Sequence, residues 1–118
     1  MLDTIAAGKE RHDRFVRRVR ASSEVWGLKG PNGFCSCTSN ESERKVIPFW
    51  SDRAYAKQCA KNDWAQFEPT SILLDAFLRQ WLPGMHNDNV LAGTNWSAHL
   101  IGNEIEPLQL KIELEKPI

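Results

Sequence analysis

The clearest change in the pattern of hydrophobic and polar positions along this chain lies between residues 45 and 56. Residues 45–50 form an apolar run that favours a β-strand, whereas residues 52–56 have the composition of a helix. Ser51 is a good N-cap residue, and the charge of Asp52 suits the positive end of a helix dipole. The pattern predicts a strand that leads directly into a helix, with their junction at one end of a sheet.

Residues 3–21 have the periodicity of an amphipathic helix. Its apolar arc consists of Ile5, His12, Phe15, Val16 and Val19, and its arginine face consists of Arg11, Arg14, Arg17, Arg18 and Arg20. Glu10 lies four residues before Arg14, and Asp13 lies four residues before Arg17. An acidic residue four positions ahead of a basic one is the favourable orientation for an ion pair along a helix. His12 is expected to be a histidine at the edge of the core with its hydrogen bonds satisfied.

Two turn signals, at residues 30–33 and 40–43, separate three predicted strands. The strands cover residues 24–28, 34–39 and 45–50, and the short turns between them predict an antiparallel meander. Pro48 cannot donate a ladder hydrogen bond, so the third strand is predicted at a sheet edge or with a bulge.

The second half of the chain continues with alternating helix and strand signals. The helix that begins near Ser51 is predicted to end around residues 61–62, and residues 68–73 read as extended chain or a strand. The next helix is marked by apolar residues at helical spacing and is expected to stop at Pro83-Gly84; these residues are Leu74, Phe77, Leu78, Trp81 and Leu82. Trp81, on this stripe, is expected to be buried.

A last confident strand is predicted at residues 89–96, followed by a loop and a helix that starts at Pro107, a residue suited to the first helical position. Leu108 and Ile112, together with Leu110 or Leu114, are expected to face inward. The element order α-βββ-α-β-α-β-α predicts a single α+β domain over residues 1–118. Its antiparallel or mixed sheet should have about four to five strands, flanked by about four helices.

Composition and charge exclude a generally basic nucleic-acid binder, because 15 Lys and Arg balance 15 Asp and Glu. The balance hides an asymmetry. Residues 1–60 carry eleven basic against seven acidic residues, and residues 61–118 carry four against eight. The arginine face of the first helix is therefore either a solvated surface or a docking face for an anionic partner, and both interpretations stay open.

The amino terminus has no apolar signal-peptide core, and no apolar run is long enough to span a membrane. Three cysteines without a secretion signal predict reduced thiols and a cytoplasmic protein. Cys35 and Cys37 would share one strand face, but the second ligand pair of a zinc site is missing, so these thiols are expected to pack in the core without metal. No cofactor is expected.

Catalytic motifs are absent from the sequence. The three histidines lie in unrelated segments, no nucleophile elbow or phosphate loop is present, and enzymatic activity is not favoured. Trp50, Arg53, Asn95 and Trp96 are the candidate binding residues, because Trp and Arg are common in binding hot spots and each tryptophan closes a predicted strand. The alternative is that the tryptophans pack under the helices and that Arg53 pairs with Asp52 or Glu104.

Several motifs occur in an order that resembles one bacterial protein family, domain of unknown function 2750. They include Val25-Trp26-Gly27-Leu28, Ile47-Pro48-Phe49-Trp50-Ser51, Gly93-Thr94-Asn95-Trp96 and Gly102-Asn103-Glu104-Ile105-Glu106-Pro107, with residues 71–84 between them. The resemblance covers nearly the whole chain and implies a small, free-standing, cytoplasmic bacterial protein with no established activity. The architecture alone is loosely similar to the amino-terminal domain of secretion-associated SseB-like proteins, and function does not follow from that likeness.

The sequence therefore predicts, first, a non-enzymatic protein-interaction module that binds another protein through the Trp50/Trp96 end of its sheet. The runner-up is anion or nucleic-acid binding through Arg11, Arg14, Arg17 and Arg18. A weaker alternative is a small enzyme with a cleft at the same sheet end.

Overall fold

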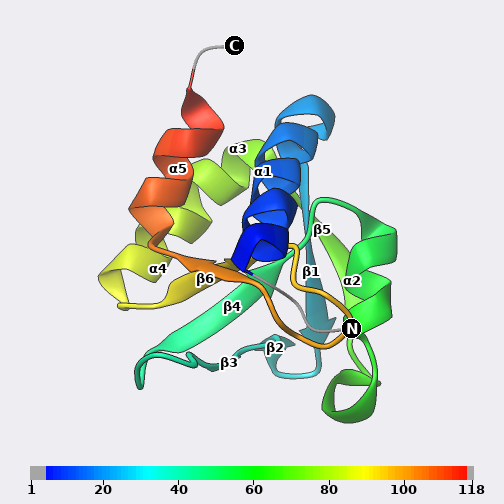
Figure 1. The fold of residues 1–118 in the computed structure, drawn as a ribbon. Coiled ribbons are helices and arrows are strands. Elements are labelled where there is room, and N and C mark those ends of the chain that lie inside the picture. The colour runs from blue at the N-terminus through cyan, green and yellow to red at the C-terminus, as the bar shows by residue number, and fades with distance from the viewer. Residues whose placement is uncertain (1–4, 117–118) are drawn as a thin grey trace.

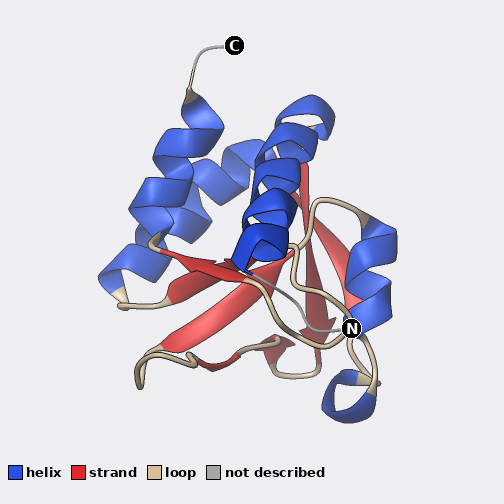
Figure 2. Cartoon of the chain, viewed as in Figure 1, coloured by secondary structure: helices blue, strands red, loops and turns tan. Residues whose placement is uncertain are grey.

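Seven strands in residues 5–116, the part of the chain that this computed structural model describes, form two β-sheets (Figure 2). The three-stranded sheet has the order β2-β1-β5, and the four-stranded sheet has the order β3-β4-β6-β7. Their bounds are β1 Glu24–Gly30, β2 Gly33–Phe34, β3 Cys37–Thr38, β4 Lys45–Phe49, β5 Glu68–Leu73, β6 Leu91–Thr94 and β7 Asn103–Ile105. The predicted α+β class is confirmed, with two small sheets in place of one.

The predicted meander is only partly present, because its middle segment, residues 33–38, pairs with a strand of each sheet. Residues 33–34 pair antiparallel with β1, and residues 37–38 pair antiparallel with β4. A backbone bridge between Trp26 and Trp50 joins the two sheets, with N···O distances of 2.8 and 2.7 Å. One strand was expected where the chain forms two short ones, since alternation alone does not show where a chain changes partners.

Pro48 was predicted to lie in an edge strand or at a bulge. As a whole, β4 is internal, between β3 and β6, and its pairing with β6 runs without a bulge, so the edge is present only locally, at Pro48 itself. β3 pairs only with Lys45 and Val46, so its two residues end before they reach the proline. On the other side, Pro48 lies opposite Gly93 in the parallel pairing of β4 with β6. The proline is tolerated in an internal strand because no residue of β3 pairs with it, so no strand on that side needs a hydrogen bond from its backbone nitrogen.

Helices α1 (Ile5–Ser22), α3 (Leu74–Ala76), α4 (Leu82–Asn87) and α5 (Pro107–Glu115) gather over one side of the sheets, and α2 (Arg53–Cys59) packs against β1 and β5 (Figure 1). α1 also contacts β1, β6, β7 and α5, so it lies across the centre of the molecule. The side chain of Ile5, which the sequence places on the apolar arc, lies outside the described residues, as do positions 3 and 4 of the predicted helix.

The prediction that Pro83-Gly84 ends a helix is wrong. The helix continues from Leu74 to Asn87 through a π-helical turn, η2 (Phe77–Trp81), in which the N–H of Leu82 bonds to the carbonyl of Phe77. The wider turn changes the hydrogen-bond register immediately before Pro83, so the proline occupies a position resembling a new helix start. The helix therefore continues past Pro83, where a proline would usually interrupt it.

Two other local predictions are corrected by the helices. α2 begins at Arg53 with Asp52 in the N-cap position, so Ser51 is not the cap, and a separate 3-10 turn, η1 (Asn62–Trp64), follows the helix. In α5, Pro107 does open the helix, but Leu108 and Ile112 are 38% and 55% exposed. Leu110 and Leu114 are the leucines of this helix that enter the core.

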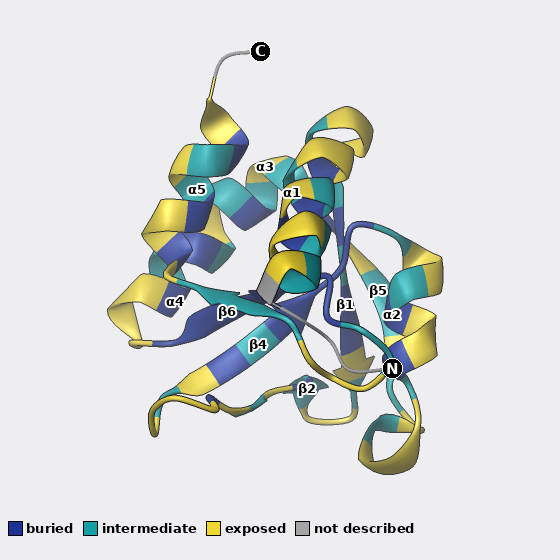
Figure 3. Cartoon of the chain, viewed as in Figure 1, coloured by how far each residue is buried: buried dark blue, intermediate teal, exposed yellow. Residues whose placement is uncertain are grey.

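The main core lies between the helices and the sheets, where the buried positions of β1, β4 and β6 face the inner sides of α1 and α5 (Figure 3). It is built from Phe15, Val19, Val25, Phe49, Ile72, Phe77, Leu82, Met85, Val90, Ala92, Leu110 and Leu114. Trp81 is only partly buried at its edge and not enclosed as expected, because its ring covers Phe34 and Phe49 from outside.

Candidate functional site

The carboxyl ends of β4 and β6 lie side by side, because these two strands are parallel neighbours. The chain leaves β4 through Trp50, Ser51 and Asp52 and leaves β6 through Asn95 and Trp96. The N–H of Asn95 donates to the carbonyl of Phe49 at 2.9 Å, which extends the contact one residue beyond the strands. The carboxyl ends of parallel strands are a common location for binding sites.

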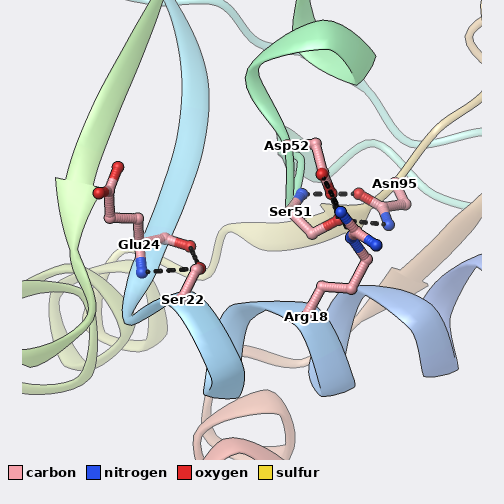
Figure 4. A network of polar contacts seen from close by, with 6 residues as sticks. All are labelled: Arg18, Ser22, Glu24, Ser51, Asp52 and Asn95. Carbon is pink, nitrogen blue, oxygen red and sulfur yellow. Dashed lines mark hydrogen bonds and ion pairs between the residues drawn. The ribbon is translucent and has the colours of Figure 1, made fainter.

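Asn95 ties these two segments together through its side chain (Figure 4). Its Oδ1 accepts a hydrogen bond from the N–H of Ser51 at 2.8 Å, and its Nδ2 donates to Ser51 Oγ at 3.0 Å. Asn95 is 3% exposed and has φ of 48°, a left-handed conformation that asparagine adopts more readily than most residues. The buried asparagine is therefore a structural clamp between the strand ends.

Trp96 is held in a narrow slot between two glycines. A Cβ atom built on Gly93 would lie 2.5 Å from the indole, and one built on Gly102 would also lie 2.5 Å from it. The indole Nε1–H donates to the carbonyl of Asn103 at 2.9 Å. The glycines and the Gly102-Asn103 pair, which the sequence shows as a motif, are explained by the packing of this one side chain.

Trp50 is fully buried and packs with Ala56 and Cys59 of α2. Its Nε1–H donates to the carbonyl of Trp96 at 3.1 Å, so its polar atom is used inside the protein. Trp96 itself is only 6% exposed. The expected surface rim of two indoles is therefore absent, because both rings stabilise the junction from within.

Arg53 is exposed at the start of α2 and does not join the buried residues. Among the described residues, Arg53 pairs with neither Asp52 nor Glu104, and Asp52 pairs with Arg18 instead. Glu104 accepts hydrogen bonds from Ser39 Oγ and from the N–H of Asn40. Of the four candidate binding residues, three are brought together by the fold and Arg53 is not.

Asp52 pairs with Arg18 of α1 in a two-pronged contact, with Nε···Oδ1 of 2.7 Å and Nη2···Oδ2 of 2.5 Å (Figure 4). Ser51 Oγ also donates to Asp52 Oδ1 at 2.6 Å. The hydrogen bond from Arg18 lowers the pKa of the Asp52 carboxyl from its ordinary value of 3.8. This pair ties the arginine face to α2, so Arg18 has a structural role within the molecule.

A hollow of about 270 Å³ is lined by residues of α1, of α2 and of the chain after β6, and we call it the α1–α2 hollow. It is lined by Arg11, Arg14, Tyr55, Gln58, Asn95, Trp96, Ser97 and Ala98. Two arginines line it and no acidic residue does, among the lining residues that the structure describes. The arginine face and the β6 end, which the sequence treats as separate candidates, therefore meet at one place.

Tyr55 and Gln58 were not identified as site residues from the sequence. They lie three residues apart on α2, so they project from one side of the helix toward α1. Their spacing could have suggested a shared face, but only the packing of α1 against this region shows which side faces the hollow. Ser97 and Ala98 were missed because they belong to an irregular loop.

The remaining ion pairs of α1 differ in strength. Arg14 lies 3.4 Å from its predicted partner, Glu10, at the outer limit of a hydrogen bond. Asp13 pairs with Lys9 at 2.8 Å, and not with Arg17 as expected. Exposed pairs along a helix contribute only about 0.3–0.5 kcal/mol, so an outside ligand can displace them at low cost.

His12 is buried and both of its ring nitrogens are hydrogen-bonded, as the sequence predicts. Nε2 lies 2.7 Å from Glu113 Oε1, and Nδ1 lies 2.8 Å from Thr94 Oγ1. In the neutral imidazole, Nε2–H donates to the carboxylate and Nδ1 accepts from the hydroxyl. Thr94 is fully buried, so this Thr-His-Glu line connects α1, β6 and α5 and offers no accessible nucleophile.

The three cysteines are free thiols, and Cys35 and Cys59 are buried. Burial raises the pKa of the Cys35 thiol to about 12 and that of the Cys59 thiol to about 11, which disfavours the reactive thiolate. Within residues 5–116, no three His, Cys, Asp or Glu side chains are grouped so that they could hold a metal ion. Nor does any helix in that range have the length and apolarity to cross a membrane.

The fold and this junction define a small α+β domain with a polar clamp at the carboxyl ends of two parallel strands. The chain belongs to the family described as Protein of unknown function (DUF2750), whose family model matches residues 12–114. This match confirms the resemblance stated from the tryptophan-bearing motifs. Neither a curated protein nor a solved structure matches the chain.

Proposed function

We propose that this protein is a non-enzymatic interaction module that binds another protein through the α1–α2 side, with an acidic segment of the partner facing the arginines. The observation that carries the proposal is the α1–α2 hollow, into which Arg11 and Arg14 bring positive charge, with no acidic side chain among the described residues that line it. Charge complementarity of this kind sets partner choice and speeds encounter. The partner would still bind at the sheet end, but it would contact α1 and α2 and not the two buried indoles.

The enzyme alternative has less support from the polar residues at this place. Asn95 and Ser51 are bonded to one another, His12 is enclosed between Thr94 and Glu113, and the thiol of Cys59 faces backbone carbonyls. General acid–base catalysis needs a titratable group within reach of a substrate. In the lining of the hollow, the described residues supply guanidinium, phenol, amide and hydroxyl groups, a set better suited to recognition.

Affinity capture from the native host with site-specific photocrosslinking tests the proposal. A photoreactive residue at Tyr55 is expected to crosslink a partner, whereas the same residue at Leu108, exposed on α5, is not. Arg14→Glu should abolish the Tyr55 crosslink. Arg79→Glu is the matched control, because Arg79 is also an arginine in an exposed i,i+4 pair, with Asp75.

Equal crosslinking from both positions, or equal loss in both arginine variants, would contradict the proposal. Circular dichroism of each variant should match that of the wild type, since neither arginine contributes to the buried core. Arg18 is left unchanged in these experiments because its substitution would also break the contact with Asp52.

A further inference from the structure

The α1–α2 hollow is lined by three segments whose side chains differ in chemistry. α1 contributes the guanidinium groups of Arg11 and Arg14, α2 contributes the phenol of Tyr55 and the amide of Gln58, and the chain after β6 contributes Trp96 and its neighbours. Positive charge, neutral hydrogen-bonding groups and apolar surface therefore meet in one small space. A ligand that fits must be anionic at one end and carry a short apolar stem.

The volume limits the size of that ligand. About 270 Å³ is below the range of about 300–1,000 Å³ that is usual for drug-sized ligands. It suits a single side chain or a chain terminus, and a planar guanidinium matches the two oxygens of a carboxylate. The apolar wall at Trp96 and Ala98 offers contact to methylene groups, which free phosphate lacks.

Arg14 already has a carboxylate near it, and that carboxylate is held weakly. Glu10 Oε1 is 3.4 Å from Arg14 Nη2, and the Glu10 side chain is 74% exposed. By contrast, Arg18 holds Asp52 through two contacts, at 2.7 and 2.5 Å. Arg14 is therefore the arginine beside the hollow whose carboxylate partner is easily exchanged.

We propose that the α1–α2 hollow is a carboxylate-binding subsite for a partner peptide, with Arg14 as the main contact and Glu10 as an internal competitor. The inference rests on the proposed function and names the chemical group that the module recognises. The carboxylate comes either from a glutamate side chain or from the carboxyl terminus of the peptide, because both present the same group on a short stem.

Nuclear magnetic resonance titrations with three short peptides test the ligand chemistry. The probes are acetyl-Gly-Glu-Gly-amide, acetyl-Gly-Gly-Gly with a free carboxyl terminus, and the neutral acetyl-Gly-Gln-Gly-amide. At least one charged probe should shift the indole N–H signal of Trp96 and the side-chain amide of Gln58 in a saturable way, and the neutral probe should not. Whichever charged probe binds more tightly identifies the source, and equal effects of all three would overturn the inference.

Substitutions of arginine test the assigned contact. Arg14→Gln is expected to weaken binding of the charged probe about tenfold or more, because a charge-assisted hydrogen bond contributes more than a neutral one. Arg17→Gln removes the same charge from the same helix but does not line the hollow, so its effect should stay within about twofold. Equal losses in the two variants would show general electrostatic attraction and would overturn the subsite.

The competitor role of Glu10 gives a test in the opposite direction. Glu10→Gln should tighten binding of the charged probe about twofold, which corresponds to the weak pair that it removes. Asp13→Asn also removes one negative charge from α1, but Asp13 is paired with Lys9 and does not line the hollow. Asp13→Asn should leave the affinity unchanged, and a gain equal to that of Glu10→Gln would exclude competition.

Inorganic phosphate is the last probe, and it should be the weaker ligand. Tighter binding of phosphate than of either charged peptide would overturn the carboxylate assignment. Failure of all the probes, with a Tyr55 crosslink that still depends on Arg14, would refute the subsite and leave the proposed function in place. Saturable probe binding without any crosslinked partner would instead contradict the proposed function and support a carboxylate site.

Discussion

Asn95 shows at the scale of one residue why a polar side chain can be buried without cost to the fold. Its amide oxygen and nitrogen both have partners on Ser51, and its left-handed backbone is one that asparagine tolerates. A buried polar group that is fully hydrogen-bonded is stabilising, whereas an orphaned one costs about 1–3 kcal/mol. The same residue joins the two strand ends and lines the α1–α2 hollow.

Gly93→Ala is expected to destabilise the protein by about 1–3 kcal/mol, because the added Cβ would lie 2.5 Å from the ring of Trp96. Denaturant unfolding followed by tryptophan fluorescence measures the change. Gly84→Ala is the control: its Cβ would meet no atom within 4 Å, and alanine favours a helix, so stability should be unchanged or slightly raised. Equal stability of the two variants would contradict the slot assigned to Trp96.

At the scale of elements, the Arg18–Asp52 pair connects α1 to the start of α2 (Figure 4). The pKa of Asp52 is lower in the folded protein than its ordinary value of 3.8, chiefly because of the hydrogen bond from Arg18. The ionised carboxylate therefore stabilises the fold above the unfolded pKa, and this contribution is lost as the pH falls through the lower folded pKa.

Asp52→Asn should lower the free energy of unfolding by about 1 kcal/mol near neutral pH, which is the upper end for partly exposed pairs. The difference from wild type should shrink as the pH falls below about 4, since the carboxyl becomes protonated first in the unfolded state and, at lower pH, in the folded state. Urea titrations at several pH values measure it. Asp75→Asn, which removes a pair confined to one helix, should differ from wild type by less than about 0.5 kcal/mol.

The continuous helix from Leu74 to Asn87 depends on its outer aromatic contact as well as on its buried face. Trp81 packs edge-on against Phe34 at 4.8 Å and against Phe49 at 5.8 Å between ring centroids. These contacts link η2 to β2 of the three-stranded sheet and to β4 of the four-stranded sheet.

Trp81→Ala is expected to cost about 2–4 kcal/mol, somewhat less than truncation of a fully enclosed tryptophan, because the ring is partly exposed. Trp81→Phe keeps an aromatic edge and should cost less than about 1.5 kcal/mol. Thermal and urea denaturation of the two variants provide the comparison. A loss below about 1 kcal/mol in the alanine variant would show that the contacts with Phe34 and Phe49 contribute little.

At the scale of the whole molecule, the charge of α1 is partly neutralised within the fold. Lys9, Arg14 and Arg18 each have a carboxylate partner among the described residues, and the formal net charge of the chain is zero. A nucleic-acid surface needs several phosphate contacts, each of which releases counterions. The arrangement favours one local anionic contact over a track along a polyanion.

Binding to single-stranded or duplex DNA should therefore be no tighter than roughly 10⁻⁵ M near physiological salt, within the usual non-specific range. Fluorescence anisotropy across a series of salt concentrations checks this, and the slope should be shallow. Submicromolar binding that disappears in Arg14→Glu/Arg17→Glu, with unchanged circular dichroism, would support nucleic-acid recognition over a protein partner.

Many local features follow from the sequence because they depend on neighbouring residues. β5 has the predicted bounds of residues 68–73, α5 opens at Pro107, and His12 is a buried histidine with both nitrogens bonded. Hydrophobic period and the conformational limits of proline act over a few residues. The α+β class and most of the element order follow from the same signals; the division of one predicted strand into β2 and β3, the turn η1, and β7, a strand of only three residues, do not.

Tertiary structure decided what depends on contacts between distant segments. Whether Trp50 and Trp96 form a surface or a core depends on α2 and Gly102, and which leucines of α5 face inward depends on α1 and α4. The hydrophobic pattern of the sequence shows that a side chain is apolar, but whether that side chain is buried depends on which helix or strand packs over it. The α1–α2 hollow combines residues separated by more than eighty positions, so only the folded chain brings the arginines of α1 to the end of β6.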